Sequence, residues 1–202
     1  MACESGHLVS LPDGYAAVVF QGPEVALPDM LAARERRVDS LRAMLAAARQ
    51  NEALLCLTLS IPGPVKTSPV LERVFDELVC AAESELADVA VRERCRTNDA
   101  TGPEYYALVE LPAHELKLRM VGIEEGHPLG RLGDLDVLAR ADDMPGQAAV
   151  NSISRRDLGL PLRRCLICGG EAKACARSRA HTVEEMQARI ATIIEQGGYS
   201  QP

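Results

Sequence analysis

Two carboxylates in the middle of the sequence have a spacing that suits a shared metal ion. Asp134 and Asp136 alternate with Leu135 and Val137, which predicts a strand over residues 132–139 with both aspartates on one face. Their Cβ atoms would then lie ~7 Å apart, close enough to share one or two divalent cations. Because Mg²⁺ prefers such oxygen ligands, we expect the two aspartates to bind Mg²⁺ and to be catalytic. The alternative is a pair of solvated carboxylates on an edge strand.

Residues that suit phosphate stand at two places in the chain. Gly130 and Arg131 come just before the predicted strand; a glycine lets a phosphate approach the backbone, and a guanidinium binds it with two hydrogen bonds. Lys66 lies in a loop that leads into a predicted helix, whose N-terminus carries a partial positive charge favourable to phosphate. For Lys66, an ordinary strand-to-helix turn with an exposed lysine is the alternative.

Three cysteines and a histidine near the C-terminus have the spacing of a metal site. Cys165 and Cys168 are separated by two residues, and Cys175 and His181 follow. This is a zinc-binding pattern, and the two glycines after Cys168 let backbone N–H groups face the thiolates. Four ligands leave no open position, so we expect Cys165, Cys168, Cys175 and His181 to hold a structural Zn²⁺. Reduced thiols packed near the surface are the alternative.

The hydrophobic pattern assigns these candidates to helices and strands. Apolar residues at helical spacing predict helices over residues 30–50, 69–82, 113–125 and 183–196. Alternating or short apolar runs predict strands over residues 15–20, 53–61, 105–111, 132–139 and 147–154, with a turn at 142–146. The order favours an α+β or α/β fold with a mostly antiparallel sheet packed against helices.

Length and cysteine usage limit the organisation and location of the chain. Its 202 residues are enough for one domain. We expect an N-terminal extension over residues 1–21 and a single domain over 22–198 that contains the Cys-rich segment 165–181. The seven cysteines come without a signal peptide or a membrane-spanning segment, which favours a reducing, cytoplasmic setting without a membrane partner.

The charge distribution limits the class of partner. The net charge of −7 and an aromatic content of 3% disfavour nucleic acid, which is bound through cationic surfaces and aromatic stacking. The stretch 155–181 nevertheless holds seven Lys and Arg against two Asp and Glu. A basic tract on an acidic protein suits a phosphorylated small molecule or an acidic partner, and a solvated basic face is the alternative.

A series of collinear motifs extends through nearly all of the chain beyond residue 21. The motifs span Gly22–Val25, Met30–Arg37, Pro62–Lys66, Thr101–Glu104, His127–Val137, Arg163–Cys168 and Cys175–His181. In these motifs the chain resembles the citrate lyase holo-acyl-carrier-protein synthases, also called apo-citrate lyase phosphoribosyl-dephospho-CoA transferases. The domain over 22–198 would then be a transferase domain, and its Asp-x-Asp strand would make the fold nucleotidyltransferase-like.

The resemblance implies a reaction and its partners. A serine of the citrate lyase acyl carrier protein attacks the phosphate next to the ribose of 2′-(5″-triphosphoribosyl)-3′-dephospho-CoA, and pyrophosphate leaves. Asp134 and Asp136 would hold the metal ion, and Lys66, Arg131 and Lys117 would hold phosphates. Arg163 and Arg164 would bind phosphates or the acidic carrier. Two alternatives are a non-catalytic, zinc-stapled binding module and the same reaction on another carrier protein.

Overall fold

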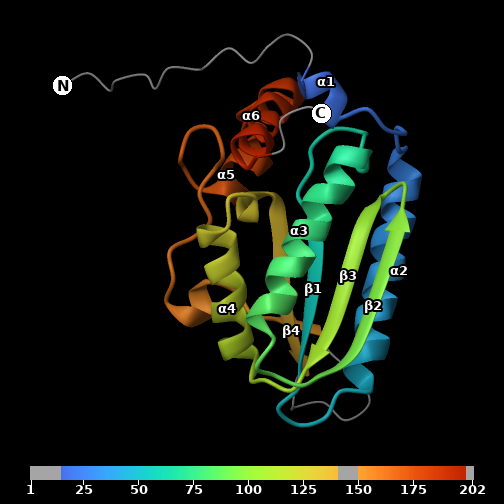
Figure 1. Ribbon diagram of the computed structural model, residues 1–202, viewed down its shortest axis with the longest axis vertical. Helices are drawn as coiled ribbons and strands as arrows, with labels where there is room; N and C mark the ends of the chain where they lie inside the picture. The colour runs from blue at the N-terminus through green and yellow to red at the C-terminus, as the bar shows by residue number, and fades with distance from the viewer. Residues whose placement is uncertain (1–14, 141–149, 199–202) are drawn as a thin grey trace, which may run out of the picture.

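A five-stranded antiparallel sheet is the centre of the molecule (Figure 1). The computed structural model describes residues 15–140 and 150–198. Across the sheet the strands follow the order β2-β3-β1-β4-β5. Their bounds are β1 (Ala53–Leu59), β2 (Val91–Asp99), β3 (Gly102–Val109), β4 (Gly133–Arg140) and β5 (Val150–Ser152). The predicted α+β fold with an antiparallel sheet is confirmed.

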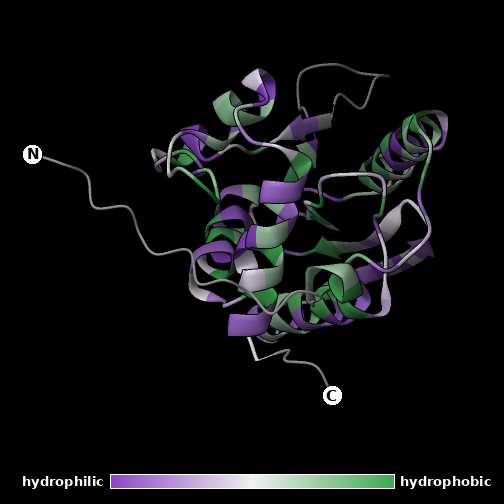
Figure 2. Ribbon diagram, turned by 90° about the horizontal axis from the view of Figure 1, so that it is seen from above, coloured by the Kyte–Doolittle hydropathy of each residue, from purple (hydrophilic) through white to green (hydrophobic). Residues whose placement is uncertain are grey.

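Helices pack around this sheet, and the longer ones carry hydrophilic as well as hydrophobic residues (Figure 2). The α-helices are α1 (Tyr15–Val19), α2 (Leu27–Ala46), α3 (Pro69–Glu85), α4 (Ala113–Gly126), α5 (Ala172–Ser178) and α6 (Val183–Gln196). Two short 3₁₀ turns are η1 (Gly130–Leu132) and η2 (Arg156–Leu158). Among the described residues, no helix is both long and apolar enough to cross a membrane.

The segment from β1 to β4 has the connectivity of a split βαβ, or ferredoxin-like, unit. It runs β1-α3-β2-β3-α4-β4, and β3 and β1 lie between β2 and β4 in the sheet. The two helices of this unit, α3 and α4, lie on one face of the sheet, whereas α2 runs behind it in Figure 1. The nucleotidyltransferase-like arrangement stays a prediction.

Burial on both faces of the sheet follows from the alternation of side chains along β1. Leu55 and Leu57 are fully buried in the larger core with α3 and α4. Leu54 and Cys56 point to the opposite face and pack with Leu45 of α2. β4 carries its two aspartates on the same face, and its Leu138 joins the cluster with α2, whereas the aspartates do not.

The start of α3 follows the sequence prediction. Ser68 Oγ accepts a hydrogen bond of 3.1 Å from the Leu71 N–H, and Pro69 occupies the first turn. The buried Ser68 hydroxyl also donates to Val19 O at 2.6 Å, which ties α1 to this cap.

Ser68→Ala should therefore lower the free energy of unfolding by about 1–3 kcal/mol, because it removes a cap and leaves Val19 O buried without its donor. Urea unfolding measures this change. Thr182→Ala, which removes the exposed cap of α6, should cost only about 1 kcal/mol; equal losses in the two variants would contradict the added weight given to the Val19 bond.

Three local predictions were wrong or incomplete. The predicted strand over 15–20 is helix α1, which packs against α6 and α3. The first long helix begins at Leu27, three residues before its predicted start, and ends at Ala46, four residues before its predicted end.

Strand β2 and helix α5 were not predicted. β2 lies at the edge of the sheet with a bulge near Val91, and its side chains are mostly exposed and polar. The turn predicted at 142–146 and the first part of the strand over 147–154 lie outside the described residues.

Candidate functional site

Asp134 and Asp136 lie on one face of β4. Leu135 and Val137, which alternate with them, are fully buried in the core on the opposite face. Across the strand pair, Asp134 lies opposite Thr58 and Asp136 lies opposite Cys56 of β1. β5 pairs only with Leu138, Ala139 and Arg140, so the stretch of β4 that carries Asp134 and Asp136 is paired with β1 alone.

The two aspartates differ in their electrostatic surroundings. Arg163 Nη1 donates to Asp134 Oδ1 at 2.6 Å, and its Nη2 donates to the backbone oxygens of Arg131 at 2.8 Å and Gly133 at 2.7 Å. Asp136 is exposed to solvent and lines a cavity. Burial, and then the charge of Asp134, raise the pKa of Asp136 above its ordinary value. A divalent cation would relieve this repulsion, so the pair fits the predicted Mg²⁺ site.

A cavity of about 480 Å³ opens over Asp136, and we call it the aspartate cavity. Serines from β5 and the segment after it, Ser152 and Ser154, form part of its wall. Its cationic lining residues are Lys117, Arg155, Arg156, Arg163, Lys173 and Arg177. The cavity therefore combines a metal-type carboxylate with several cations, which is an arrangement that suits a polyphosphate.

Lys117 belongs to a buried ion network beneath the aspartate cavity. Lys117 and Glu124, both on α4, are 5% and 3% exposed. Lys117 Nζ donates to Leu135 O at 2.7 Å and lies 3.7 Å from Glu124 Oε1. Arg155 donates to Glu124 Oε2 at 2.5 Å. Lys117 is thus tied to the backbone of β4 between the two aspartates, and Glu124 is neutralised from two sides.

The four residues of the predicted metal site come together. Cys165, Cys168, Cys175 and His181 each offer a ligand atom, and these atoms all lie within 4.8 Å of one another. Cys168 Sγ and Cys175 Sγ are 3.5 Å apart. Distances of this size between the ligand atoms suit a tetrahedral site around one Zn²⁺ with Zn–S bonds of about 2.3 Å.

The local fold explains why these ligands converge. A β-bridge joins Arg164 to Glu171, and the Cys165 N–H donates to Gly170 O at 2.7 Å. This tight turn brings Cys168 back toward α5, which supplies Cys175. Gly169 has a φ of +70°, a left-handed conformation that glycine adopts without strain. The two glycines after Cys168 thus form the tight turn that brings the ligands together.

Two further observations support a cation among these side chains. His181 Nε2 is buried and has no hydrogen-bond partner in the described part of the chain. A metal ion bound to this nitrogen would satisfy it. The backbone of Gly170, and then His181 and Cys175, lower the pKa of Cys168, whereas the hydrogen bond with Cys168 raises the pKa of Cys175, so without a cation the two thiols share one negative charge.

The structure places Lys66 and Gly130 away from these cavities. Lys66 Nζ donates to Ile61 O at 2.5 Å and lines a smaller cavity of about 280 Å³ near the start of α2. Gly130 is buried, and a Cβ there would clash with Ile123 O. Gly130 therefore permits close packing of η1 against α4, and its role at a phosphate stays a prediction. Arg131 and Arg164, by contrast, line the cavities around Arg163.

Several cavity residues were missed in the sequence. Arg155, Lys173 and Arg177 belong to the basic tract 155–181 that the charge count had singled out, but no motif distinguished them. Arg189 lies on α6, outside that tract, and reaches the site only because α6 packs beside the turn that precedes β4. Charge counting could find the first group, whereas Arg189 needs the tertiary structure.

Comparisons with known proteins show the family of this chain. Residues 25–197 match the family model described as apo-citrate lyase phosphoribosyl-dephospho-CoA transferase. A Streptococcus pyogenes serotype M3 protein named "Probable apo-citrate lyase phosphoribosyl-dephospho-CoA transferase" is 45% identical over 87% of this chain and 88% of its own. A Citrobacter koseri protein named "Apo-citrate lyase phosphoribosyl-dephospho-CoA transferase" is 36% identical over 84% of this chain and 88% of its own. The chain belongs to the apo-citrate lyase phosphoribosyl-dephospho-CoA transferase family.

Proposed function

We propose that the protein transfers the phosphoribosyl-dephospho-CoA group of 2′-(5″-triphosphoribosyl)-3′-dephospho-CoA to a serine of the citrate lyase acyl carrier protein. The observation that carries this proposal is the family match over residues 25–197. The serine oxygen forms a bond to the phosphorus next to the ribose, the bond to the departing pyrophosphate breaks, and the serine proton passes to solvent or to a base. This reaction matches a site that combines carboxylates with many guanidinium groups.

Asp134 and Asp136 would hold Mg²⁺ in this proposal. When bound, Mg²⁺ would neutralise the triphosphate and the leaving pyrophosphate. Arg163 holds Asp134 at 2.6 Å and lines the aspartate cavity, so it orients this carboxylate and presents a guanidinium to the phosphates. Lys117 donates to Leu135 O and fixes the strand between the two aspartates.

The Cys165–His181 cluster would hold a structural Zn²⁺. Four protein ligands complete a tetrahedral shell, so the ion has no position for substrate. Arg163 and Arg164 directly precede Cys165 in the chain. The cluster would therefore fix the segment that carries these arginines against β4.

Intact-mass spectrometry tests the proposed function. The protein is incubated with apo citrate lyase acyl carrier protein, Mg²⁺ and the triphosphoribosyl-dephospho-CoA precursor. The carrier should gain the mass of the precursor minus pyrophosphate. A competent carrier that gains no mass would contradict the proposal. A parallel reaction with the carrier protein of a decarboxylase shows whether the acceptor is citrate lyase in particular.

The acid limb of the pH–activity profile should lie above about pH 3.9, the ordinary pKa of an aspartate. Asp136 must lose its proton to bind a cation, and its surroundings raise its pKa, so activity should fall as the pH falls through this raised value. Higher Mg²⁺ should shift the limb to lower pH because metal and proton compete for the carboxylate. The measurement is kcat/KM against pH at two Mg²⁺ concentrations; a limb that does not move with Mg²⁺ would contradict the metal role.

A further inference from the structure

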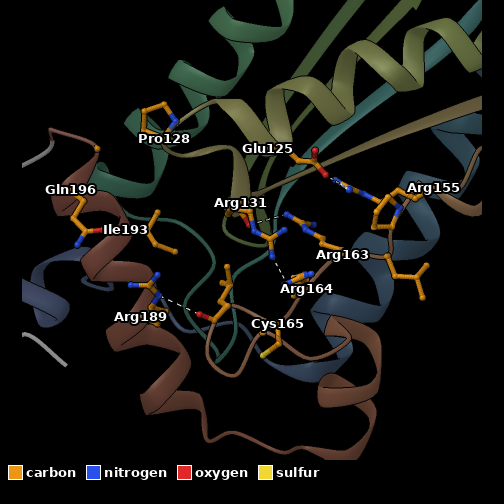
Figure 3. Close-up of a pocket in the computed structure, with 15 residues that line it drawn as sticks. Glu125, Pro128, Arg131, Arg155, Arg163, Arg164, Cys165, Arg189, Ile193 and Gln196 are labelled. Atoms are coloured by element: carbon orange, nitrogen blue, oxygen red, sulfur yellow. Dashed lines mark hydrogen bonds and ion pairs between the residues drawn. The ribbon is translucent and has the colours of Figure 1, made fainter. Parts of the chain in front are cut away.

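We propose that a second cavity binds a diphosphate group, separately from Asp136. This cavity, of about 740 Å³, lies between α6, the turn before β4 and residues 161–169 (Figure 3). Its charged lining residues are Arg131, Arg155, Arg163, Arg164, Arg189 and Glu125. We call it the arginine cavity. The identity of the molecule that carries the diphosphate rests on the proposed function, whereas the binding of a diphosphate rests on the cavity itself.

Two of the five arginines are neutralised by carboxylates. Arg155 donates at 2.5 Å both to Glu124 Oε2 and to Glu125 Oε1. Arg163 donates to Asp134 at 2.6 Å. Figure 3 shows Arg155 and Glu125 facing each other at the side of the cavity, while Arg131, Arg163 and Arg164 converge near its centre.

The other three arginines have no carboxylate partner among the described residues. Arg131 Nη2 donates to Arg164 O, and Arg189 Nε donates to Leu166 O at 3.2 Å. The Arg164 side chain has no hydrogen bond or ion pair within that part of the chain. Three guanidinium groups from η1, residues 161–169 and α6 thus face one hollow, and none of the three forms an ion pair with a carboxylate of the described residues.

The cavity is electropositive as a result. Burial, and then the charges of Arg163 and Arg155, lower the pKa of Arg131 below its ordinary value. Cations that repel one another in a partly buried hollow favour an anionic ligand. A guanidinium binds a phosphate through paired N–H groups, so three of them suit two linked phosphates.

The position of the arginine cavity separates it from the metal site. Asp136 lines the aspartate cavity but not the arginine cavity, whereas Arg155, Leu162 and Arg163 line both, so the two cavities are neighbours. The proposed substrate carries a triphosphate on its added ribose and a separate, bridging diphosphate within its dephospho-CoA part. The triphosphate would lie at the aspartates and the diphosphate in the arginine cavity. Inorganic pyrophosphate, the leaving group, has the same chemistry and is the second source to test.

Isothermal titration without added Mg²⁺ tests this assignment, with dephospho-CoA and inorganic pyrophosphate as separate probes. Arg164→Gln and Arg189→Gln are suitable variants because both side chains are exposed. Each should weaken binding about tenfold or more, because each removes a charge-assisted hydrogen bond to phosphate. Arg42→Gln is the matched control, since Arg42 is exposed on α2 and 3.6 Å from Asp39. Arg42→Gln and Asp136→Asn should both bind as the wild type does.

The outcomes separate this inference from the proposed function. Arginine-dependent binding of dephospho-CoA assigns the cavity to the bridging diphosphate, and arginine-dependent binding of pyrophosphate alone assigns it to the leaving group. The inference is overturned if neither diphosphate probe binds, or if all variants bind the probes equally. It is also overturned if the arginine variants raise the KM for the carrier protein but bind diphosphate as the wild type does.

If the wild type modifies the carrier and both arginine variants keep the wild-type KM for the precursor, the proposed function stands but the cavity assignment is removed. Arginine-dependent binding without any carrier modification would do the reverse.

Discussion

Asp136→Asn should abolish transfer and leave the fold at least as stable as that of the wild type. Asparagine keeps the shape of the side chain but loses the charge that a cation requires. Since a metal ion contributes several kcal/mol to transition-state stabilisation, we expect kcat to fall by about 10³-fold or more. The pKa of Asp136 is raised in the folded state, so its ionised form destabilises the fold, and this penalty grows as the pH rises through the raised pKa. At neutral pH the substitution removes the penalty, and the Tm should stay level or rise.

Carrier modification followed by mass spectrometry, together with thermal unfolding, checks both halves of this result. Asp99→Asn is the matched control, because Asp99 is an exposed carboxylate on β2, 3.9 Å from Arg36. It should leave activity and Tm unchanged. An Asp136→Asn variant that keeps its activity would remove the metal role. A variant that loses activity together with its Tm would indicate a structural role for Asp136.

Cys168→Ser should release the metal ion and weaken binding of the precursor. A serine oxygen is a poor replacement for a thiolate at a Zn²⁺ site. Cys165, Cys175 and His181 also form part of the wall of a third cavity, of about 580 Å³, which Arg131, Arg163 and Arg164 line as well. Without the ion, the segment that places Arg163 and Arg164 loses its anchor. We expect the KM for the precursor to rise by about 10–100-fold, which is the effect of removing one charge-assisted hydrogen bond.

Elemental analysis of the purified protein and steady-state kinetics test this prediction. The wild type should contain one Zn²⁺ per chain, and Cys168→Ser should contain much less. Cys80→Ser is the matched control because Cys80 is a free, exposed cysteine on α3. If Cys168→Ser retained both its zinc and the wild-type KM, the cluster would be a group of reduced thiols with no part in substrate binding.

Local signals in the sequence predicted most of the fold near the site. The alternation from Asp134 to Val137 predicted the two faces of β4, and apolar residues at helical spacing predicted α3 from residue 69 and α6 from residue 183. In each case a short run of residues determines its own conformation. The spacing of the cysteines predicted the cluster for the same reason, since a tight turn joins its first two ligands.

The predictions that were wrong depended on contacts distant in the sequence. Tyr15–Val19 resembles a strand by composition, but it forms a helix that packs on α6 and α3. Strand β2 carries few apolar residues, so only its pairing with β3 makes it a strand. The packing role of Gly130 is also hidden in the sequence, because it depends on Ile123 O occupying the space that a Cβ would need. Likewise, Arg189 joins the arginine cavity only through the packing of α6.

The edge strand β2 has a consequence for how the protein behaves at high concentration. Free strand edges invite another chain to add a strand and seed aggregates. Arg92, Arg94 and Arg96 project from β2 and are held by Glu52, Glu83 and Asp76, at 2.9, 2.8 and 2.7 Å. A bulge near Val91 further breaks the regular edge. An approaching strand would have to bury these ion pairs, so β2 protects the open side of the sheet against templated self-assembly.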